Sequence, residues 1–206
     1  MKFNEQWTFI AGLRYDNFKE YNKATGYSYS DHDVTPRVAL TYQPQEDLSF
    51  YINYSESFNP VSSSDQEGVA NEGLLAPETG KQTEIGMKNS WLDGKIMSTF
   101  AIYRINKQNV VMSNPDENAG DSGIPELLNV GEVESNGFES TLVGDISDNI
   151  TITANYAYND TSVIKGVTGD TITNAFGDGS KFTNATKHQA GLWTRYAINS
   201  IDSSIA

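Results

Sequence analysis

The chain has 206 residues and a formal net charge of −13, with 14 Lys and Arg against 27 Asp and Glu. So acidic a chain repels nucleic-acid phosphates, and without any Cys it offers neither a disulfide scaffold nor a zinc–thiolate site. No apolar run approaches the roughly 20 residues that a spanning helix needs, but a spanning β-barrel is compatible with the composition because its strands are apolar only at alternate positions.

Alternation of apolar and polar residues with a period of two dominates the sequence from its beginning. Trp7, Phe9 and Leu13 fall on one face of a strand, with Thr8 and Arg14 on the other. Such alternation predicts strands with one apolar and one polar face. We predict eight strands, near residues 5–18, 34–43, 48–58, 80–92, 95–112, 129–144, 149–160 and 186–198.

Short and long connections alternate between these strands. The short turns are rich in Asp, Gly, Asn and Pro, and lie at residues 43–47, 93–94 and 145–149. The long polar loops are predicted at residues 19–33, 59–79, 113–128 and 161–185. This asymmetry is typical of transmembrane β-barrels, which have short periplasmic turns and long extracellular loops. The expected fold is therefore all-β: an antiparallel barrel segment of about eight strands in four hairpins.

The Asp93-Gly94 turn fixes a register for one hairpin. Because Asp-Gly favours a type I′ turn, Trp91 should face Ile96, and the apolar residues of both strands should share one side. The same register places Arg104 on this apolar side, opposite Thr83, which is tolerable only near the outer rim of a membrane.

The other two short turns sort apolar and polar residues in the same way. A five-residue turn at 43–47 predicts the pairs Leu40–Phe50 and Val38–Ile52, with Ile52 facing lipid and Asn53 facing the barrel interior. A five-residue turn at 145–149 predicts the pairs Leu142–Ile152 and Phe138–Tyr156.

Several sequence blocks carry a resemblance to a known family through their order and spacing, and together they cover most of the chain. They are Thr35–Pro44, Tyr51–Pro60, Leu75–Lys88, Leu92–Lys95, Phe100–Ile105, Val133–Glu139 and Lys187–Trp193. With these blocks the chain resembles the TonB-dependent siderophore receptors of bacterial outer membranes, in particular the ferrichrome-receptor-like branch.

The resemblance implies a place and a role. Residues 1–206 are expected to be a partial barrel domain that lacks the plug domain and the terminal strands of such receptors. The implied function is TonB-dependent uptake of ferric siderophores in the bacterial outer membrane. The implied partners are outer-membrane lipid, a ferric siderophore and the TonB energy-coupling complex, which acts through the plug. Iron would arrive as a chelate, so no cofactor and no protein metal site are expected.

Two groups of residues are candidates for the functional site. Tyr21, Tyr27 and Tyr29 in the first predicted loop offer rigid apolar faces with one hydroxyl each, which suits contact with a ferric chelate. A hydrated polar network is expected to line the lumen: Arg37, Asn53, Glu84, Lys88 and Glu139, with Glu56 also assigned to it. Glu84 and Lys88 lie about 13 Å apart along one strand face, so they are not expected to form a direct pair.

The sequence offers no convincing catalytic constellation. Asp31-His32-Asp33 has metal-binding chemistry, but its position in a polar stretch favours a solvated loop. His188 lacks the nucleophile elbow and oxyanion signals of a Ser–His–Asp enzyme. We therefore do not expect an enzyme.

Two alternatives remain open at this level. Eight tilted strands can close into a complete small outer-membrane barrel that acts as an anchor or adhesin. A soluble β-sandwich that binds carbohydrate would show the same alternation, with its apolar face turned inward.

Overall fold

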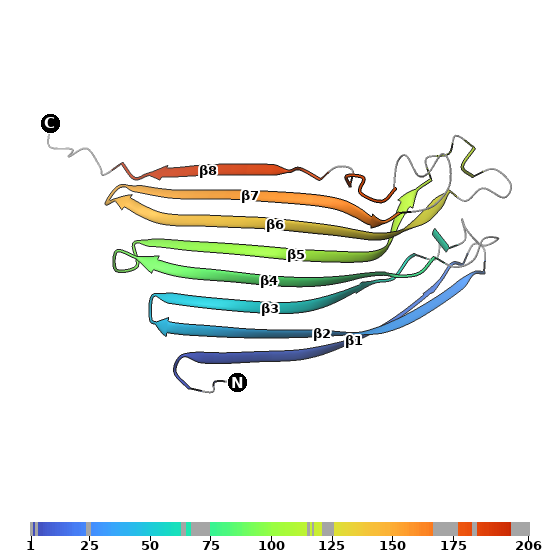
Figure 1. Ribbon diagram of the computed structural model, residues 1–206, viewed down its shortest axis with the longest axis horizontal. Coiled ribbons are helices and arrows are strands. Elements are labelled where there is room, and N and C mark those ends of the chain that lie inside the picture. Colours follow the sequence, from blue (N-terminus) through green and yellow to red (C-terminus); the bar gives the residue numbers. More distant parts are fainter. Residues whose placement is uncertain are drawn as a thin grey trace, which may run out of the picture.

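The computed structural model describes residues 2, 4–23, 26–62, 65–66, 75–114, 116, 118–120, 126–166, 177–182 and 185–198. Eight strands form one antiparallel sheet in chain order, so each strand pairs with its neighbours in the sequence (Figure 1). They are β1 (Trp7–Tyr21), β2 (Ser28–Gln45), β3 (Leu48–Asn59), β4 (Glu78–Trp91), β5 (Ile96–Ser113), β6 (Leu127–Ser147), β7 (Ile150–Lys165) and β8 (His188–Tyr196). All eight predicted strands are confirmed.

The short and long connections lie at opposite ends of the sheet, as predicted. One end of the sheet, the turn end, carries the short connections β2–β3, β4–β5 and β6–β7. The opposite end is the loop end (Figure 1). The first predicted long loop is wrong, because β1 reaches Tyr21 and β2 begins at Ser28. Polar residues occupy both faces of this hairpin tip, and they hide the strand alternation from a sequence pattern.

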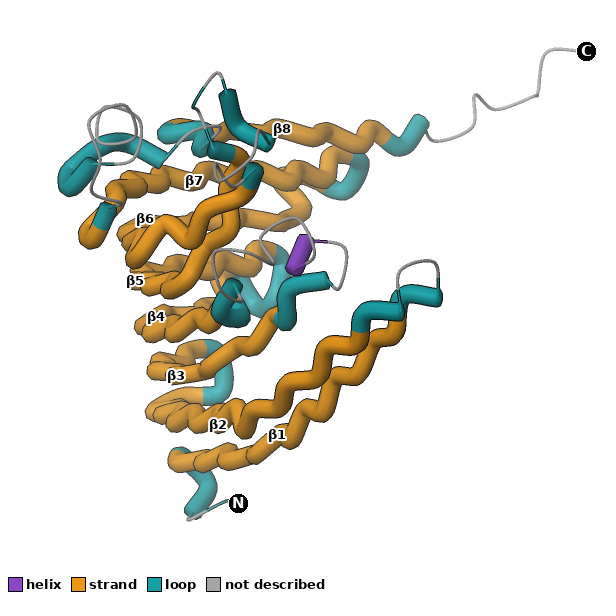
Figure 2. The backbone as a smooth tube through the Cα atoms, turned by 90° about the vertical axis from the view of Figure 1, so that its right-hand side faces the viewer, coloured by secondary structure: helices purple, strands orange, loops and turns teal. Residues whose placement is uncertain are grey.

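The sheet is a curved, open arc (Figure 2). A short helical segment that contains Asp65 and Gln66 lies on its hollow side. Within the described ranges β1 and β8 do not pair with each other, so the chain does not form the closed eight-stranded barrel of the first alternative. Among the described residues, no helix has the length and apolar character to cross a membrane.

The outer, convex face of the arc carries large apolar side chains that the chain leaves uncovered. Ile85 is 50% exposed, Ile102 57% and Leu192 72%. The two buried apolar clusters are small, and both involve the loop end: Val110, Val133 and Val163 form one, and Val61 and Leu75 the other. A soluble β-sandwich would bury its apolar face under a second sheet, whereas this outer face fits a lipid environment.

The register of the β4–β5 hairpin is confirmed. Trp91 pairs with Ile96, Met87 with Phe100, and Thr83 with Arg104. Asp93 and Gly94 have φ angles of 55° and 88°, as a type I′ turn requires, and Leu92 is also left-handed at 53°.

The predicted registers of the other two hairpins are wrong by two residues. Leu40 pairs with Ile52 and not with Phe50, and Val38 pairs with Tyr54 and not with Ile52. Likewise Leu142 pairs with Ala154, and Phe138 with Tyr158. Each turn is two residues long rather than five, and the strand that precedes it carries a one-residue bulge next to the turn, at Tyr42–Gln45 and at Asp145–Ser147. Because the net error is even, each side chain keeps its predicted face.

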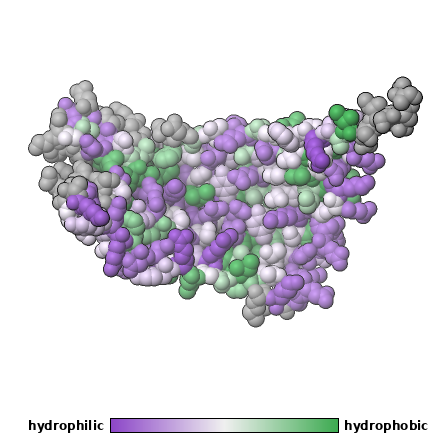
Figure 3. All heavy atoms as spheres, turned by 180° about the vertical axis from the view of Figure 1, so that it is seen from behind, coloured by the Kyte–Doolittle hydropathy of each residue, from purple (hydrophilic) through white to green (hydrophobic). Residues whose placement is uncertain are grey.

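The hollow face is polar. Seen from this side, hydrophilic side chains predominate over the middle of the strands (Figure 3). Ile10 on β1, Met97 on β5 and Trp193 on β8 are exceptions, with 55%, 58% and 74% exposure. The two faces thus have the polarity that a barrel wall needs between lipid and a hydrated lumen.

Candidate functional site

The five residues expected to line the lumen share the hollow face. Alternation along β2, β3, β4 and β6 places them on the side opposite the exposed apolar residues: Arg37, Asn53, Glu84, Lys88 and Glu139. Glu56 was assigned to the same network, and that assignment is wrong. It lies on the outer face with Ile52 and accepts a hydrogen bond from the Tyr54 hydroxyl.

Tyr51 organises the centre of this polar network. Its hydroxyl donates a 2.7 Å hydrogen bond to Glu84 Oε1, and its ring lies 5.6 Å from Lys88 Nζ. Asn53 and Gln82 also donate to Glu84, at 3.4 and 3.2 Å. Tyr51 therefore lies between Glu84 and Lys88, and the hydroxyl and two amides satisfy the carboxylate without a direct ion pair.

Large inner side chains have small partners on the neighbouring strands. Tyr51 pairs with Gly86, Gly86 with Ala101, Ala101 with Glu139 and Glu139 with Ala157. The small neighbours leave room beside each large residue. This sorting, which depends on register, could not be seen in single strands of the sequence.

A fork opens between β2 and β3 toward the loop end. Their last paired residues are Arg37 and Ser55, after which β2 continues along β1 while β3 continues along β4 (Figure 2). Pro36, next to this point, has no backbone N–H to donate to a ladder. The fork contains a cavity of about 530 Å³ lined by Arg14, Thr35, Pro36, Arg37, Asn53, Ser55, Glu56, Gln82 and Glu84.

The connection between β3 and β4 is anchored at the loop end. The Gln66 side chain is fully buried, and its amide donates to the Leu75 carbonyl and accepts from the Leu75 N–H, both at 2.8 Å. Ala76 N–H donates to Asn129 Oδ1 at 3.0 Å, which ties the same segment to β6. These contacts hold the described parts of residues 60–77 against the hollow side.

Asn109 supports this anchor through an unusual backbone conformation. Its φ angle is 57°, and its side chain donates to the Pro77 carbonyl at 3.1 Å. Asn129 Nδ2 donates to the Asn109 carbonyl at 3.0 Å. Asn tolerates the left-handed region better than most residues, so its position here is explained.

The three candidate tyrosines do not share one surface. Tyr29 is buried on the hollow side, and its hydroxyl donates to Asp31 Oδ2 at 2.9 Å. Burial is the main cause that raises the pKa of Tyr29 to about 12, and the hydrogen bond to Asp31 contributes to the same shift. The Tyr29 hydroxyl therefore stays protonated and donates at neutral pH. Tyr21 is 60% exposed and falls in the row of the outer face, opposite Ser28. Tyr27 is half-buried in the connection.

Asp31-His32-Asp33 lies on strand β2 and not in a loop. Alternation puts Asp31 and Asp33 on one face and His32 on the other, and the Tyr15 ring lies 6.3 Å from the His32 ring. Within the part of the chain that the structure describes, no group of three or more His, Cys, Asp or Glu is placed to hold a metal ion.

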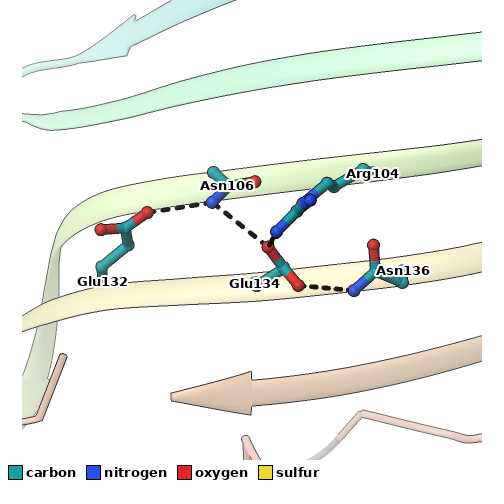
Figure 4. Close-up of polar contacts among 5 residues, drawn as sticks. All are labelled: Arg104, Asn106, Glu132, Glu134 and Asn136. Carbon is teal, nitrogen blue, oxygen red and sulfur yellow. Dashed lines mark hydrogen bonds and ion pairs between the residues drawn. The ribbon is translucent and has the colours of Figure 1, made fainter. Parts of the chain in front are cut away.

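A second polar cluster, not anticipated from the sequence, lies on the outer face near the loop end (Figure 4). Arg104 Nε donates to Glu134 Oε2 at 2.6 Å, and Asn136 donates to Glu134 Oε1 at 2.6 Å. Asn106 donates to Glu132 at 2.9 Å. Arg104, predicted to lie near the outer rim, is thus ion-paired just beyond Ile102 and is consistent with the edge of an apolar band.

Comparisons with known proteins agree with this architecture. The family model described as "TonB dependent receptor-like, beta-barrel" matches residues 1–202. The probable TonB-dependent siderophore receptor PiuA of Acinetobacter baumannii is 31% identical over 96% of this chain and 28% of its own length. The ferrioxamine B receptor of Salmonella typhimurium is 30% identical over 95% of this chain and 26% of its own length.

The fold matches a solved receptor as well. The crystal structure of PiuA from Acinetobacter baumannii superposes with a TM-score of 0.72 at 30% identity, covering 93% of this chain and 29% of that one. The chain therefore spans little more than a quarter of the length of these two receptors. With eight antiparallel strands, an apolar outer face and a family match along nearly its whole length, the chain belongs to the TonB-dependent receptor β-barrel family.

Proposed function

We propose that this chain is part of the barrel wall of an outer-membrane receptor for TonB-dependent uptake of ferric siderophores. The observation that carries the proposal is the contrast between the two faces of the sheet. Uncovered apolar side chains such as Ile85 and Ile102 suit lipid, while Tyr51, Glu84 and Lys88 form a connected polar surface on the other side. Family members are receptors of the bacterial outer membrane and not enzymes.

In this proposal the wall itself carries out no chemistry. Iron enters as a chelate, which binds from the loop end, and release is driven by the TonB complex acting through a plug domain. Residues 1–206 supply a partial barrel domain in such a receptor. Tyr21 falls in the row of the outer face and Tyr29 is buried, so contact between a loop tyrosine and a chelate is proposed for Tyr27, which lies half-buried in the connection.

The test uses the full-length receptor that contains this chain. Binding of a panel of hydroxamate, catecholate and carboxylate ferric siderophores is measured by fluorescence quenching in detergent. Uptake of radioactive iron is then measured in cells with and without TonB. We expect binding of at least one ferric chelate and uptake only when TonB is present. Absence of binding to every chelate, or uptake that does not depend on TonB, would overturn the proposal.

A further inference from the structure

The fork between β2 and β3 is lined by two arginines, Arg14 and Arg37. The Arg14 guanidinium is bonded to Asp16 Oδ1 at 2.7 Å. Arg37 is exposed, and among the residues that the structure describes none forms an ion pair or hydrogen bond with its guanidinium. In a chain of net charge −13, an unpaired arginine that faces a cavity is available to an anion.

The neighbours of Arg37 in the fork are mostly hydrogen-bonding side chains. Thr35 and Ser55 supply hydroxyls, and Asn53 and Gln82 supply amides that donate hydrogen bonds to Glu84. A guanidinium presents a planar pair of N–H donors that matches a carboxylate. The wall at β2 and β3 is therefore suited to an anionic oxygen-bearing group.

The two carboxylates of the fork do not neutralise Arg37. Glu56 is bonded to Tyr54, with which it shares the outer face. Glu84 lies on β4, two strands across and two residues along from Arg37 and so roughly 12 Å away, and Tyr51 donates to it. Because Coulomb energy falls with distance, a carboxylate that contacts Arg37 at about 4 Å on the β2 side of the fork is attracted by Arg37 more strongly than it is repelled by the more distant Glu84.

We propose that this fork is a subsite for a free carboxylate group of the transported chelate, and that Arg37 holds it. The inference rests on the proposed function and adds the charge class of the substrate. A cavity of about 530 Å³ lies in the range of small-molecule pockets and exceeds what one protein carboxylate would fill. The carboxylate faces β2, and hydrogen-bond donors of the same ligand face Glu84 on β4.

The test compares two iron chelates of nearly equal size that differ in one charge. The N-succinamoyl and N-succinyl derivatives of ferrioxamine B share one hydroxamate core and one linker, but the first ends in a neutral amide and the second in a carboxylate. Their dissociation constants are measured with the full-length receptor in detergent. The wild type should bind the N-succinyl derivative roughly fivefold more tightly, the difference expected of a partly solvated charge pair.

Variants assign the preference to one residue. Arg37→Gln should bind both derivatives equally, and Arg37→Lys should keep part of the preference. Arg195→Gln is the matched control, because Arg195 is an exposed arginine on the same face but on β8, at the turn end. The Arg195→Gln variant should prefer the carboxylate-bearing chelate as strongly as the wild type does.

Three results would count against the inference. A wild type without a preference for the carboxylate, or an Arg37→Gln variant that retains it, overturns the subsite while leaving the receptor function intact. Failure of the wild type to bind any ferric chelate overturns the proposed function, and the subsite with it.

Discussion

The Tyr51 ring lies so close to Gly86 on the neighbouring strand that a Cβ atom at residue 86 would be 2.3 Å from it. The same arrangement recurs two strands further on, where a Cβ at Gly137 would lie 2.2 Å from the Tyr103 ring. Glycine has no side chain of its own to pack in a strand, and here the neighbouring aromatic ring covers it. Both units lie on the hollow face.

Substitution of Gly86 by Ala should therefore destabilise the barrel. The Cβ has to displace the Tyr51 ring, and overpacking of this kind costs roughly 1–3 kcal/mol. Urea unfolding of the full-length receptor in detergent measures the change. Gly12→Ala is the control, because no atom lies within 4 Å of a Cβ there. Equal effects of the two substitutions would show that the contact with Tyr51 does not constrain the wall.

Removal of the Gln66 amide should release the β3–β4 connection. Gln66→Leu leaves the Leu75 N–H and carbonyl without their partners, a loss of roughly 1–3 kcal/mol for a buried group. We expect faster proteolytic cleavage within residues 60–77, mapped by mass spectrometry. Asp65→Asn is the matched control, since Asp65 is only half-buried and the hydrogen bond to Ser62 uses its backbone N–H. Unchanged cleavage in Gln66→Leu would mean that other contacts hold the segment.

Much of this fold follows from the sequence, because alternation depends only on which face each side chain meets. The predicted faces of Ile52 and Asn53 are correct although the predicted register was wrong by two residues. A register shift by an even number of residues leaves each side chain on the same face of the sheet. The Asp93-Gly94 turn gave a correct register because its left-handed conformation is specific to those residue types.

The candidate site was less accessible to sequence reasoning. Tyr51 and Gly86 belong to strands joined by a long connection, so no turn fixes their pairing. The fork at Arg37 arises where one ladder ends, and Pro36 was its only local signal. The bulges next to the short turns place an extra residue in the strand that precedes each turn, and alternation alone does not locate that residue.

Asn109 should be sensitive to the shape of its replacement. Its φ angle of 57° suits Gly but penalises a β-branched residue. Both Asn109→Gly and Asn109→Val lose the hydrogen bond to Pro77, so their difference isolates the backbone. The Val variant should be less stable than the Gly variant by roughly 1–2 kcal/mol in urea unfolding. Equal stability would contradict the left-handed conformation.

The edge of the apolar band should fall between Ile102 and Arg104 on β5. Ile102 faces outward without a polar partner, while Arg104 is paired with Glu134. Spin labels at the two positions in lipid bilayers report the boundary through collisions with oxygen or with an aqueous nickel complex. Collisions with oxygen should dominate for the label at residue 102, and collisions with the nickel complex for the label at residue 104. Dominance of oxygen at both would place the Arg104–Glu134 pair inside the hydrocarbon.

The most direct test of the barrel wall is the facing of two adjacent residues, Ile52 and Asn53. The chain has no Cys, so Ile52→Cys and Asn53→Cys each introduce a unique thiol into this segment. Both are made in the receptor with its plug domain deleted, so that water reaches the lumen, and are treated with a membrane-impermeant maleimide in outer membranes. The Cys at 53 should react and the Cys at 52 should resist. Equal reactivity, or the reverse order, would contradict the assignment of the outer face to lipid and of the hollow face to the lumen.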